Sequence, residues 1–485
     1  MAHKQGFTDS HSQTPGDREK SESLPLDHPA SVPLIDTHCH LEMEAFDPDR
    51  KEVIQRAKNA GLELLITVGS SLESTIKGIE LSEQYDFIYA SAGIHPHDAA
   101  DFSEDIYKKL KELSKRRKVV AIGETGLDYY YDHSPRQTQR EVFGKHLQLS
   151  KDTGLPVIIH CREAEQDTMR ILRESDISNG VLHFFSGDME MAEEVMSMGF
   201  YLSIAGPVTY KKSGRMKEIA RLIPDDYLLV ETDSPYLSPE PFRGRRNEPS
   251  YIQNTIKHIA ALRGISYEDL ARITTLNAKR LFRIGSIAEK PEITYRIRDS
   301  LYLNITNRCT NKCSFCVKFH TDYVKGHRLR LDREPTEEEI KKEIGDPSRY
   351  NEIVFCGYGE PLQRLDFVRN VSAWIKEHGG RVRINTNGHA NLIHKRDITP
   401  ELKGIVDSIS ISLDAQDKDT YNRICRPAFE NAYDGIIRFT KQSGKFIPDV
   451  RLTVVDLEGV DIEKCEKIAE ELNVRLVVRK FNVVG

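Results

Sequence analysis

The chain has 485 residues, of which 39% are apolar and 30% are charged, and its formal net charge is −6 at pH 7. This length exceeds what one hydrophobic core usually organises, so we expect two domains in a globular chain. The sequence has no signal-peptide pattern and no run of the roughly 20 apolar residues that a membrane helix needs, and its negative charge gives no global attraction for a polyanion, so any nucleic-acid binding must be local. Three of the eight cysteines are closely grouped, which fits a reducing compartment, so we expect a cytoplasmic protein without membrane contact.

The first 32 residues are polar and carry no hydrophobic periodicity, so we interpret residues 1–32 as a disordered leader. From residue 33 to residue 285, short apolar segments alternate with amphipathic stretches. The expected strands are 34–37, 62–68, 87–92, 119–122, 156–159, 180–183, 200–204 and 227–230. Eight β-α units that close on themselves form a TIM (β/α)8 barrel, and the segment 276–282 is expected to be a helix that caps it.

A boundary is expected at 286–296, which we assign as a linker because a new strand follows at once. The region 297–485 again alternates strands with helices, so the fold class is α/β throughout. The expected strands of this region are 301–305, 352–355, 381–385, 408–413, 451–455 and 475–479. Six such units form a (β/α)6 partial barrel with an open side. The two regions share no motif, so they are fused units and not internal repeats.

Histidine and acidic side chains recur at the carboxyl ends of the strands expected in the first region. Two histidines follow the first strand with one residue between them, and because strand side chains alternate faces, both imidazoles are expected to point inward. A TIM barrel keeps its chemistry at the carboxyl ends of its strands, so the side chains from five different strands are expected to converge on one rim. The candidate metal ligands are His38, His40, Glu124, His160, His183 and Asp233.

Four imidazoles and two carboxylates suit a pair of divalent ions. One ion is expected between the two histidines of the first strand, and the other between the histidines of the fifth and sixth strands. Glu124 is expected to bridge the two ions. Asp233 is expected to bind metal and to take the proton from the attacking water, so Glu124 and Asp233 are the candidate catalytic residues.

The motifs of this region resemble those of the TatD family of metal-dependent deoxyribonucleases, within the amidohydrolase-like barrels. The resemblance covers about residues 34–285 and carries, in order, D-x-H-x-H-L, G-x-H-P-H, G-E-x-G-L-D, H-x-R, H-x-F-S-G and E-T-D-S-P. It implies 3′–5′ deoxyribonuclease or related phosphodiesterase activity on DNA or a nucleotide-like substrate. Mg²⁺ is the expected ion, with Mn²⁺ and Zn²⁺ as alternatives. The resemblance also implies that His95 and Arg162 contact the substrate, whereas His97 is more simply interpreted as a residue of loop packing.

Cys309, Cys313 and Cys316 follow the first expected strand of the second region with C-x3-C-x2-C spacing. Three thiolates can hold three corners of a [4Fe–4S] cluster and leave one iron free for a small molecule to chelate. Zinc needs four ligands, and the other cysteines of this region form no second pair, so we favour the cluster. Its expected place is the mouth of the partial barrel.

Residues after the next strands offer contacts for a cofactor beside the cluster. Two glycines let the backbone approach a ligand, a glutamate can accept hydrogen bonds from an ammonium group, and polar residues after the third and fourth strands suit a ribose. A phenylalanine before the last cysteine can shield the cluster or stack on an adenine. The candidate cofactor-binding residues are Phe315, Gly357, Gly359, Glu360, Asn385 and Ser412.

Over residues 295–485 these features resemble the radical S-adenosylmethionine (SAM) superfamily, in a TatD-associated type. The usual G-G-E-P motif of the superfamily is replaced here by Tyr358-Gly359-Glu360-Pro361. The resemblance implies that the methionyl amine and carboxylate of S-adenosylmethionine chelate the free iron. One electron, from a donor such as flavodoxin or ferredoxin, would then cleave the sulfonium C–S bond to give a 5′-deoxyadenosyl radical.

The resulting hypothesis is a bifunctional enzyme, in which a two-metal hydrolase is fused to a radical SAM enzyme whose substrate the sequence does not identify. Fusion suggests that both sites act on the same nucleic acid or nucleotide-like compound, which is an association and not a mechanism. In an alternative hypothesis, the hydrolase acts on a small amide, lactone or phosphoester made by the radical SAM half. A third hypothesis makes one barrel a docking module for the other, but the complete ligand sets in both regions oppose it.

Overall fold

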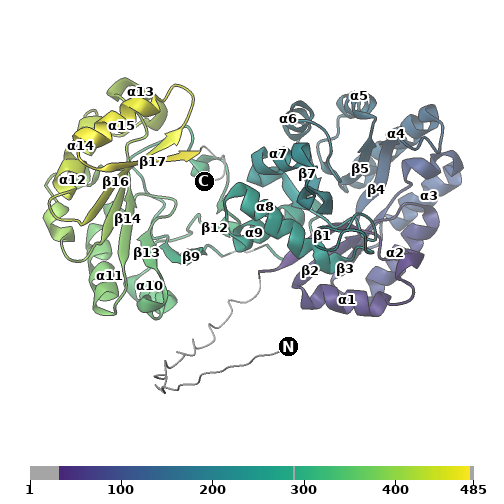
Figure 1. Ribbon diagram of the computed structural model, residues 1–485, viewed down its shortest axis with the longest axis horizontal. Coiled ribbons are helices and arrows are strands. Elements are labelled where there is room, and N and C mark those ends of the chain that lie inside the picture. Colours follow the sequence, from purple (N-terminus) through teal and green to yellow (C-terminus); the bar gives the residue numbers. More distant parts are fainter. Residues whose placement is uncertain (1–31, 288–289, 481–485) are drawn as a thin grey trace, which may run out of the picture.

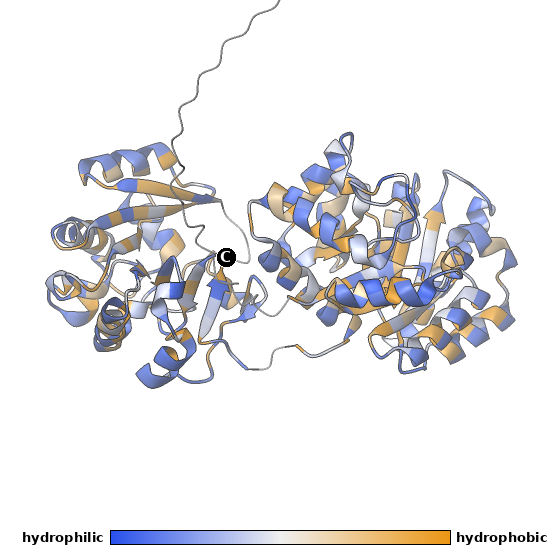
Figure 2. Cartoon of the chain, turned by 60° about the horizontal axis from the view of Figure 1, so that its bottom comes forward, coloured by the Kyte–Doolittle hydropathy of each residue, from blue (hydrophilic) through white to orange (hydrophobic). Residues whose placement is uncertain are grey.

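The computed structural model describes residues 32–287 and 290–480, and its ribbon shows two α/β regions side by side (Figure 1). The leader expected at 1–32 lies outside the described residues except for its last one. Hydrophobic residues concentrate on the strands of both regions, and the outer faces of the helices are hydrophilic (Figure 2). None of the helices in the described ranges is both long enough and apolar enough to cross a membrane.

The first region is an eight-stranded parallel barrel in which each strand pairs with the next along the chain. Its strands are β1 Leu34–Cys39, β2 Leu62–Thr67, β3 Ile88–Ala92, β4 Val119–Asp128, β5 Val157–Arg162, β6 Gly180–Leu182, β7 Tyr201–Ile204 and β8 Leu228–Val230. Residues just past β8 close the barrel on β1, because Asp233 N donates to His38 O at 2.8 Å and His40 N donates to Ser234 O at 2.8 Å. The predicted (β/α)8 fold is confirmed.

Helices surround this barrel and bury their apolar faces on the outside of the strands. They are α1 Arg50–Asn59, α2 Leu72–Gln84, α3 Glu104–Leu113, α4 Arg136–Thr153, α5 Glu165–Ser175, α6 Met189–Ser197, α7 Gly214–Leu222, α8 Ile252–Arg263 and α9 Tyr267–Phe282. Short 3-10 helices lie at Glu44–Phe46, Pro96–Asp101, Gly206–Thr209, Asp225–Tyr227 and Pro249–Tyr251. Side-chain oxygens of Ser71, Ser103 and Asp188 cap the amino ends of α2, α3 and α6, which satisfies backbone N–H groups that the helix itself leaves unpaired.

Helix α9 closes the amino-terminal end of the barrel. Thr275 Oγ1 donates to Pro33 O at 2.7 Å, just before β1, and Asn277 Nδ2 donates to Leu228 O at 2.9 Å, at the start of β8. Leu281 and Phe282 are buried in a cluster with residues of the barrel interior. The carboxyl ends of the strands, where a TIM barrel keeps its site, are therefore at the opposite face.

The second region contains a seven-stranded sheet in the order β17-β16-β15-β14-β13-β10-β9. Six strands are parallel and match the predicted ones: β10 Ser300–Leu303, β13 Glu352–Phe355, β14 Val382–Thr386, β15 Ser408–Ser412, β16 Asp449–Asp456 and β17 Arg475–Lys480. The accompanying helices are α10 Glu337–Ile344, α11 Leu365–Glu377, α12 Ala390–His394, α13 Lys418–Cys425, α14 Ala432–Ser443 and α15 Ile462–Glu471. Short 3-10 helices lie at Val317–Phe319, Pro347–Arg349, Pro361–Arg364 and Thr399–Leu402.

The seventh strand, β9 Thr294–Ile297, corrects the expectation that residues 286–296 form a linker. It pairs antiparallel to β10, with Tyr295 opposite Tyr302, and Tyr295 is 5% exposed. A four-residue strand with a charged residue at its third position gives too short an alternation to be recognised in a sequence. The second domain therefore begins before residue 297 and includes part of the expected linker.

A small hairpin joins the two regions. It is formed by β11 Tyr323–Val324 and β12 His327–Arg328, and it packs beside α9 (Figure 1). Arg272 Nε on α9 donates to His327 Nε2 at 2.9 Å, and Glu292 accepts from His327 Nδ1 at 2.8 Å. The second region thus contacts the eight-stranded barrel at the barrel's amino-terminal end.

Candidate metal centre and cysteine loop

The candidate metal ligands of the first region converge at the carboxyl end of the barrel. Five of them, together with His95 and Arg162, line a cavity of about 530 Å³. His38 and Glu124 are 1% and 3% exposed, so their positions are fixed by the surrounding protein. Both lie within strands, on β1 and β4, whereas His183 directly follows the short strand β6 and Asp233 lies three residues past the end of β8.

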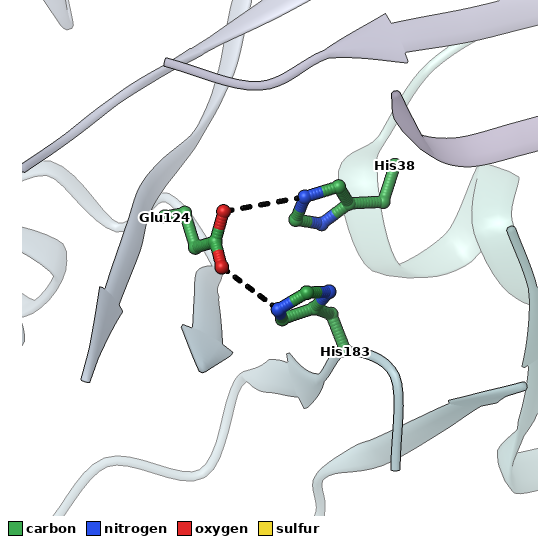
Figure 3. A group of neighbouring side chains, drawn as sticks. All are labelled: His38, Glu124 and His183. Carbon is green, nitrogen blue, oxygen red and sulfur yellow. Dashed lines mark ion pairs between the residues drawn. The ribbon is translucent and has the colours of Figure 1, made fainter. Parts of the chain in front are cut away.

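Glu124 occupies the centre of this group and directs its two carboxylate oxygens to different histidines (Figure 3). Oε2 lies 3.3 Å from His38 Nε2, and Oε1 lies 2.8 Å from His183 Nε2. Oε1 is also 2.9 Å from His160 Nδ1. A carboxylate that points one oxygen to each side is the arrangement that a bridging ligand requires.

The remaining donors complete overlapping sets of possible ligand atoms. One set joins His38, His40 and Asp233, and another joins Glu124 and His160 with His95, each with its ligand atoms within 4.8 Å of one another. The Nε2 atoms of His38 and His40 face each other at 3.2 Å. Two ring nitrogens at this distance need a proton or a cation between them. This donor chemistry fits divalent metal ions.

Outer residues orient the ligands, and the sequence analysis did not single them out. The Val68 carbonyl lies 2.9 Å from His40 Nδ1 and can only accept, so that nitrogen donates and Nε2 is left for a metal. Buried Asp128 lies 3.1 Å from His160 Nε2 and 3.0 Å from His97 Nε2. Glu231 lies 3.5 Å from His183 Nδ1. Asp128 and Glu231 stand inside the G-E-x-G-L-D and E-T-D-S-P motifs, which is the signal that could have identified them.

Burial and neighbouring charges set the protonation of the acids at this site. Burial raises the pKa of Asp36 to about 8, although Thr232 donates to its carboxylate from both the backbone and the hydroxyl. Burial also acts to raise the pKa of Glu124, but the surrounding imidazoles, His183 first, hold it well below its usual value. Glu124 is therefore ionised and is suited to bind cations.

The predicted substrate contacts take two different positions. His95 lies at the level of the ligands, with Nε2 3.5 Å from Glu124 Oε1. Arg162 is exposed at the rim, and its guanidinium stacks over the rings of Tyr130 and Tyr131 at 4.1 and 4.7 Å. His97 Nε2 lies 3.0 Å from buried Asp128, and His97 also lines the cavity.

In the second region, Cys309, Cys313 and Cys316 lie on the loop that follows β10, at the carboxyl end of the sheet. None of the three forms a disulfide bond, and all three are partly buried. The loop is fixed to the end of α13, because Ser314 N donates to Ile424 O at 2.8 Å and Lys312 N donates to Cys425 O at 3.0 Å.

The surroundings of Cys309 suit a cluster-bound sulfur. Its Sγ accepts from Asn311 N at 3.4 Å and from Asn387 Nδ2 at 3.7 Å, and hydrogen bonds of this kind tune iron–sulfur clusters. Burial raises the pKa of the Cys309 thiol to about 11, so the thiolate needs a bound metal to form at neutral pH. The donor set fits an iron–sulfur cluster. Asn387 was not a candidate in the sequence analysis, although it belongs to a polar stretch after the third strand.

The glycines of the Gly-Tyr-Gly-Glu-Pro turn are explained by close packing against the cysteine loop. A Cβ on Gly357 would lie 2.1 Å from Asn304 Oδ1, and one on Gly359 would lie 2.4 Å from the Arg308 carbonyl oxygen. The turn can therefore approach the loop only because both residues lack a side chain.

Glu360 is 2% exposed and joins this turn to the next strand. Its carboxylate accepts from Asn387 N at 2.7 Å and from Thr386 Oγ1 at 2.8 Å. Burial raises the pKa of Glu360 to about 7, and these hydrogen bonds act against that rise. A cation beside a buried carboxylate of this kind stabilises its ionised form, so Glu360 has the property expected of a residue that accepts hydrogen bonds from an ammonium group.

The other cofactor-binding candidates differ in their surroundings. Phe315 packs against the hydrophobic core of the second region. Asn385 Oδ1 accepts from Arg383 NH1 at 2.7 Å, so part of its hydrogen-bonding capacity is already used within the protein. Ser412 is the last residue of β15, so it lies at the same end of the parallel strands as the cysteine loop, which follows β10.

Comparison with known proteins assigns both regions. Residues 35–283 match the family model of TatD related DNases, and residues 303–472 match that of the radical SAM superfamily. The uncharacterized metal-dependent hydrolase YabD of Bacillus subtilis is 49% identical over 254 residues, which are 52% of this chain and 100% of that protein. The 3′-5′ ssDNA/RNA exonuclease TatD of a Rahnella strain is 35% identical, over 52% of this chain and 99% of that protein.

Among solved structures, the TatD homologue YjjV from Escherichia coli K12 has a TM-score of 0.50 and 30% identity, covering 52% of this chain and 98% of that one. Each of these relatives covers about half of this chain. The chain belongs to the TatD-related family of metal-dependent hydrolases and carries a radical SAM domain in the same polypeptide.

Proposed function

We propose that the barrel hydrolyses phosphodiester bonds of single-stranded DNA or RNA from the 3′ end, with two divalent ions between its histidines. The position of Glu124 carries the proposal, because one carboxylate oxygen faces His38 and the other faces His160 and His183. The name of the Rahnella relative supports the choice of substrate. Mg²⁺ is the ion that we expect in the cell.

The ligand residues would fall into two groups, one for each ion. His38, His40 and Asp233 would hold one ion, and His160 and His183, whose ring nitrogens lie 3.1 Å apart, would hold the other, with Glu124 between the two groups. When bound, such a pair of ions neutralises phosphoryl charge and acidifies water. Asp233 accepts the proton of the attacking water, since its carboxylate is 14% exposed and faces the cavity.

Aromatic side chains at the rim offer a surface for unpaired bases. Tyr130 and Tyr131 are 53% and 51% exposed, and the Tyr131 ring stacks on His133 at 5.5 Å with an interplanar angle of 4°. Tyr236, which also lines the cavity, is 49% exposed. Exposed rings beside a phosphate-binding site favour single strands, because the bases of a duplex are already stacked on each other. Arg162 between the rings and the cavity suits a phosphate contact.

For the second region, we propose that Cys309, Cys313 and Cys316 hold a [4Fe–4S] cluster and that Glu360 receives the amino group of S-adenosylmethionine. When bound and reduced by a flavodoxin or ferredoxin, this cofactor supplies a 5′-deoxyadenosyl radical. The protein residues position the cofactor: Asn387 donates to Cys309, and the turn around Gly359 holds Glu360 against the cysteine loop.

Digestion of an oligonucleotide tests the hydrolase proposal. Wild-type protein with Mg²⁺ should shorten a 5′-labelled single-stranded 20-mer from its 3′ end, and Glu124→Ala should reduce the rate by about 10³-fold or more, which corresponds to about 4 kcal/mol of transition-state stabilisation. Lys441→Ala, on the outer helix α14, is a control that should digest normally. An intact oligonucleotide after prolonged incubation, together with hydrolysis of a small amide, lactone or phosphoester, would instead establish the small-molecule function.

A further inference from the structure

A basic cleft lies where the two regions meet. Its volume is about 1280 Å³, and its lining comes from the end of α9 and residues 284–287 and 290 on one side, and from the β11–β12 hairpin on the other. The lining includes five cationic side chains and no acidic one among the described residues: Lys279, Arg280, Arg283, Lys290 and Arg328.

Acidic partners outside the lining neutralise only part of this charge. Lys279 pairs with Glu63 at 2.8 Å, whereas the nearest acids to Arg280 and Arg328 are 3.8 and 3.7 Å away. Arg283 and Lys290 are exposed, and neither has an ion pair with any residue in the described part of the chain. Two of the five lining cations thus have no ion pair in the described ranges, and in a chain with a net charge of −6 such a local excess of positive charge attracts anions.

The cleft is separate from the hydrolytic metal centre. The end of α9 covers the amino-terminal end of the barrel, because Asn277 binds the start of β8 and Lys279 binds Glu63 at the start of β2. The metal ligands lie at the opposite end of the same strands. An anion in the cleft therefore cannot be the part of a substrate that is being hydrolysed.

The cleft does adjoin the cysteine-bearing end of the second region. Tyr323 of the hairpin lies under the Arg280 guanidinium at 4.5 Å. Val324, next in the hairpin, packs in a cluster with Tyr358, whose hydroxyl donates to the Thr321 carbonyl between the cysteine loop and the hairpin. The hydrolase domain thus contributes cations to the surroundings of the radical SAM site.

We propose that this cleft binds the phosphates of a single nucleic-acid strand and guides it to the radical SAM site. The inference rests on the proposed function, since it takes nucleic acid as the substrate of the whole chain. The volume exceeds the roughly 300–1,000 Å³ of small-molecule pockets, which favours an extended ligand. Several cations with an arginine-stacked tyrosine form the combination that binds single strands, through phosphate contacts and base stacking.

Fluorescence anisotropy of the full-length, cluster-reconstituted protein tests the proposal. The probe is a 5′-fluorescein-labelled (dT)20 with phosphorothioate linkages, in buffer without divalent ions, so that it is not digested. The test variant is Arg283→Glu/Lys290→Glu. The control is Lys441→Glu/Lys445→Glu, which makes the same change of charge at exposed residues at the end of α14 and just after it, on the outer side of the second region.

We expect the cleft variant to bind the strand at least about 10-fold more weakly at 50 mM salt, and the control to stay within about twofold of wild type. Loss of two phosphate contacts should also reduce the slope of log K against log salt by about 1.4. Equal binding by wild type and the cleft variant, or equal weakening by the control, would overturn the proposal. Displacement of the strand by micromolar dTMP would also overturn it, because the site would then be one for a small phosphoester.

The two proposals can fail separately. The nuclease proposal fails alone if the wild-type protein digests no oligonucleotide but its affinity for the strand still depends on Arg283 and Lys290. That result would support strand binding in the cleft. The cleft proposal fails alone if Arg283→Glu/Lys290→Glu digests the oligonucleotide normally and binds the strand with unchanged affinity. The nuclease proposal would then stand. Digestion is measured with the same 20-mer lacking phosphorothioate linkages, in Mg²⁺.

Discussion

The metal centre and the cysteine loop hold their donor atoms in different ways. His38 and Glu124 of the metal centre lie on barrel strands, are buried, and already face each other with ligand spacing. The three thiols lie on one loop and are partly buried, and backbone hydrogen bonds from Lys312 and Ser314 to the end of α13 position that loop. The first site is therefore organised by the fold itself, whereas the second would depend on its proposed cluster to fix the sulfur atoms relative to one another.

This difference has a physical origin. Neighbouring strands of a parallel barrel hold their side chains at fixed spacing, so residues from distant parts of the sequence form one site without a ligand. A loop offers its donors close together in sequence but fixes each one less firmly. Metal removal should consequently leave the barrel folded, whereas loss of the cluster should loosen the region around the cysteines.

The largest expected effect concerns the cysteine loop. Cys313→Ala should abolish formation of 5′-deoxyadenosine after anaerobic reconstitution and reduction, because two thiolates cannot hold the cluster. Oligonucleotide digestion by the same variant should stay within about twofold of wild type, since the barrel has its own core. Chromatographic quantification of 5′-deoxyadenosine makes the measurement, and Cys356→Ser is the matched control that should retain the product. Production by Cys313→Ala equal to that of wild type would remove the cluster assignment.

A smaller effect is expected from a change in a residue that contacts a candidate metal ligand without being a ligand itself. Asp128→Asn keeps the size of the side chain but weakens the partner of His160, whose Nε2 lies 3.1 Å from the carboxylate. Partners of this kind typically contribute 10- to 100-fold to metal affinity or activity. We expect the Mg²⁺ concentration for half-maximal digestion to rise by about that factor, with the maximal rate changed less. An unchanged metal dependence would mean that the centre is organised by its ligands alone.

The smallest effect concerns stability at acidic pH. His146 is buried, its Nε2 accepts from Ile94 N at 3.1 Å, and burial lowers its pKa to about 4. An unfolded histidine has a pKa near 6.5, so between pH 6.5 and pH 4 the unfolded state binds more protons, and stability falls as the pH falls through this window by up to about 1.4 kcal/mol per pH unit. The contribution of neutral His146 to the free energy of unfolding is fully present above pH 6.5.

Urea unfolding of the barrel, followed by circular dichroism at pH 7 and pH 5, measures this dependence. His146→Gln retains an acceptor for Ile94 but cannot titrate, so it should lose about 1–2 kcal/mol less stability than wild type between these two pH values. Equal losses in the two proteins would show that His146 is not the group responsible.

The sequence was sufficient for the strand order and for the convergence of the six candidate ligands, because each of them lies at or shortly past the end of an apolar segment and a barrel brings such ends together. His95 was expected to contact substrate, and the structure places it as close to Glu124 as a ligand, since its loop runs into the cavity. Strand β9 was missed because its partner, β10, is what stabilises so short a segment. The basic cleft could not be predicted either, because its cations belong to two domains whose contact no local pattern encodes.

The number of divalent ions that the barrel binds tests the central claim most directly. Isothermal titration of the full-length protein with Mn²⁺ should give two ions per chain, and Glu124→Gln should give fewer than two, because the carboxylate between the two groups of histidines is lost. A wild-type stoichiometry of one, or a stoichiometry of two that Glu124→Gln leaves unchanged, would contradict a bridged pair of ions at this site.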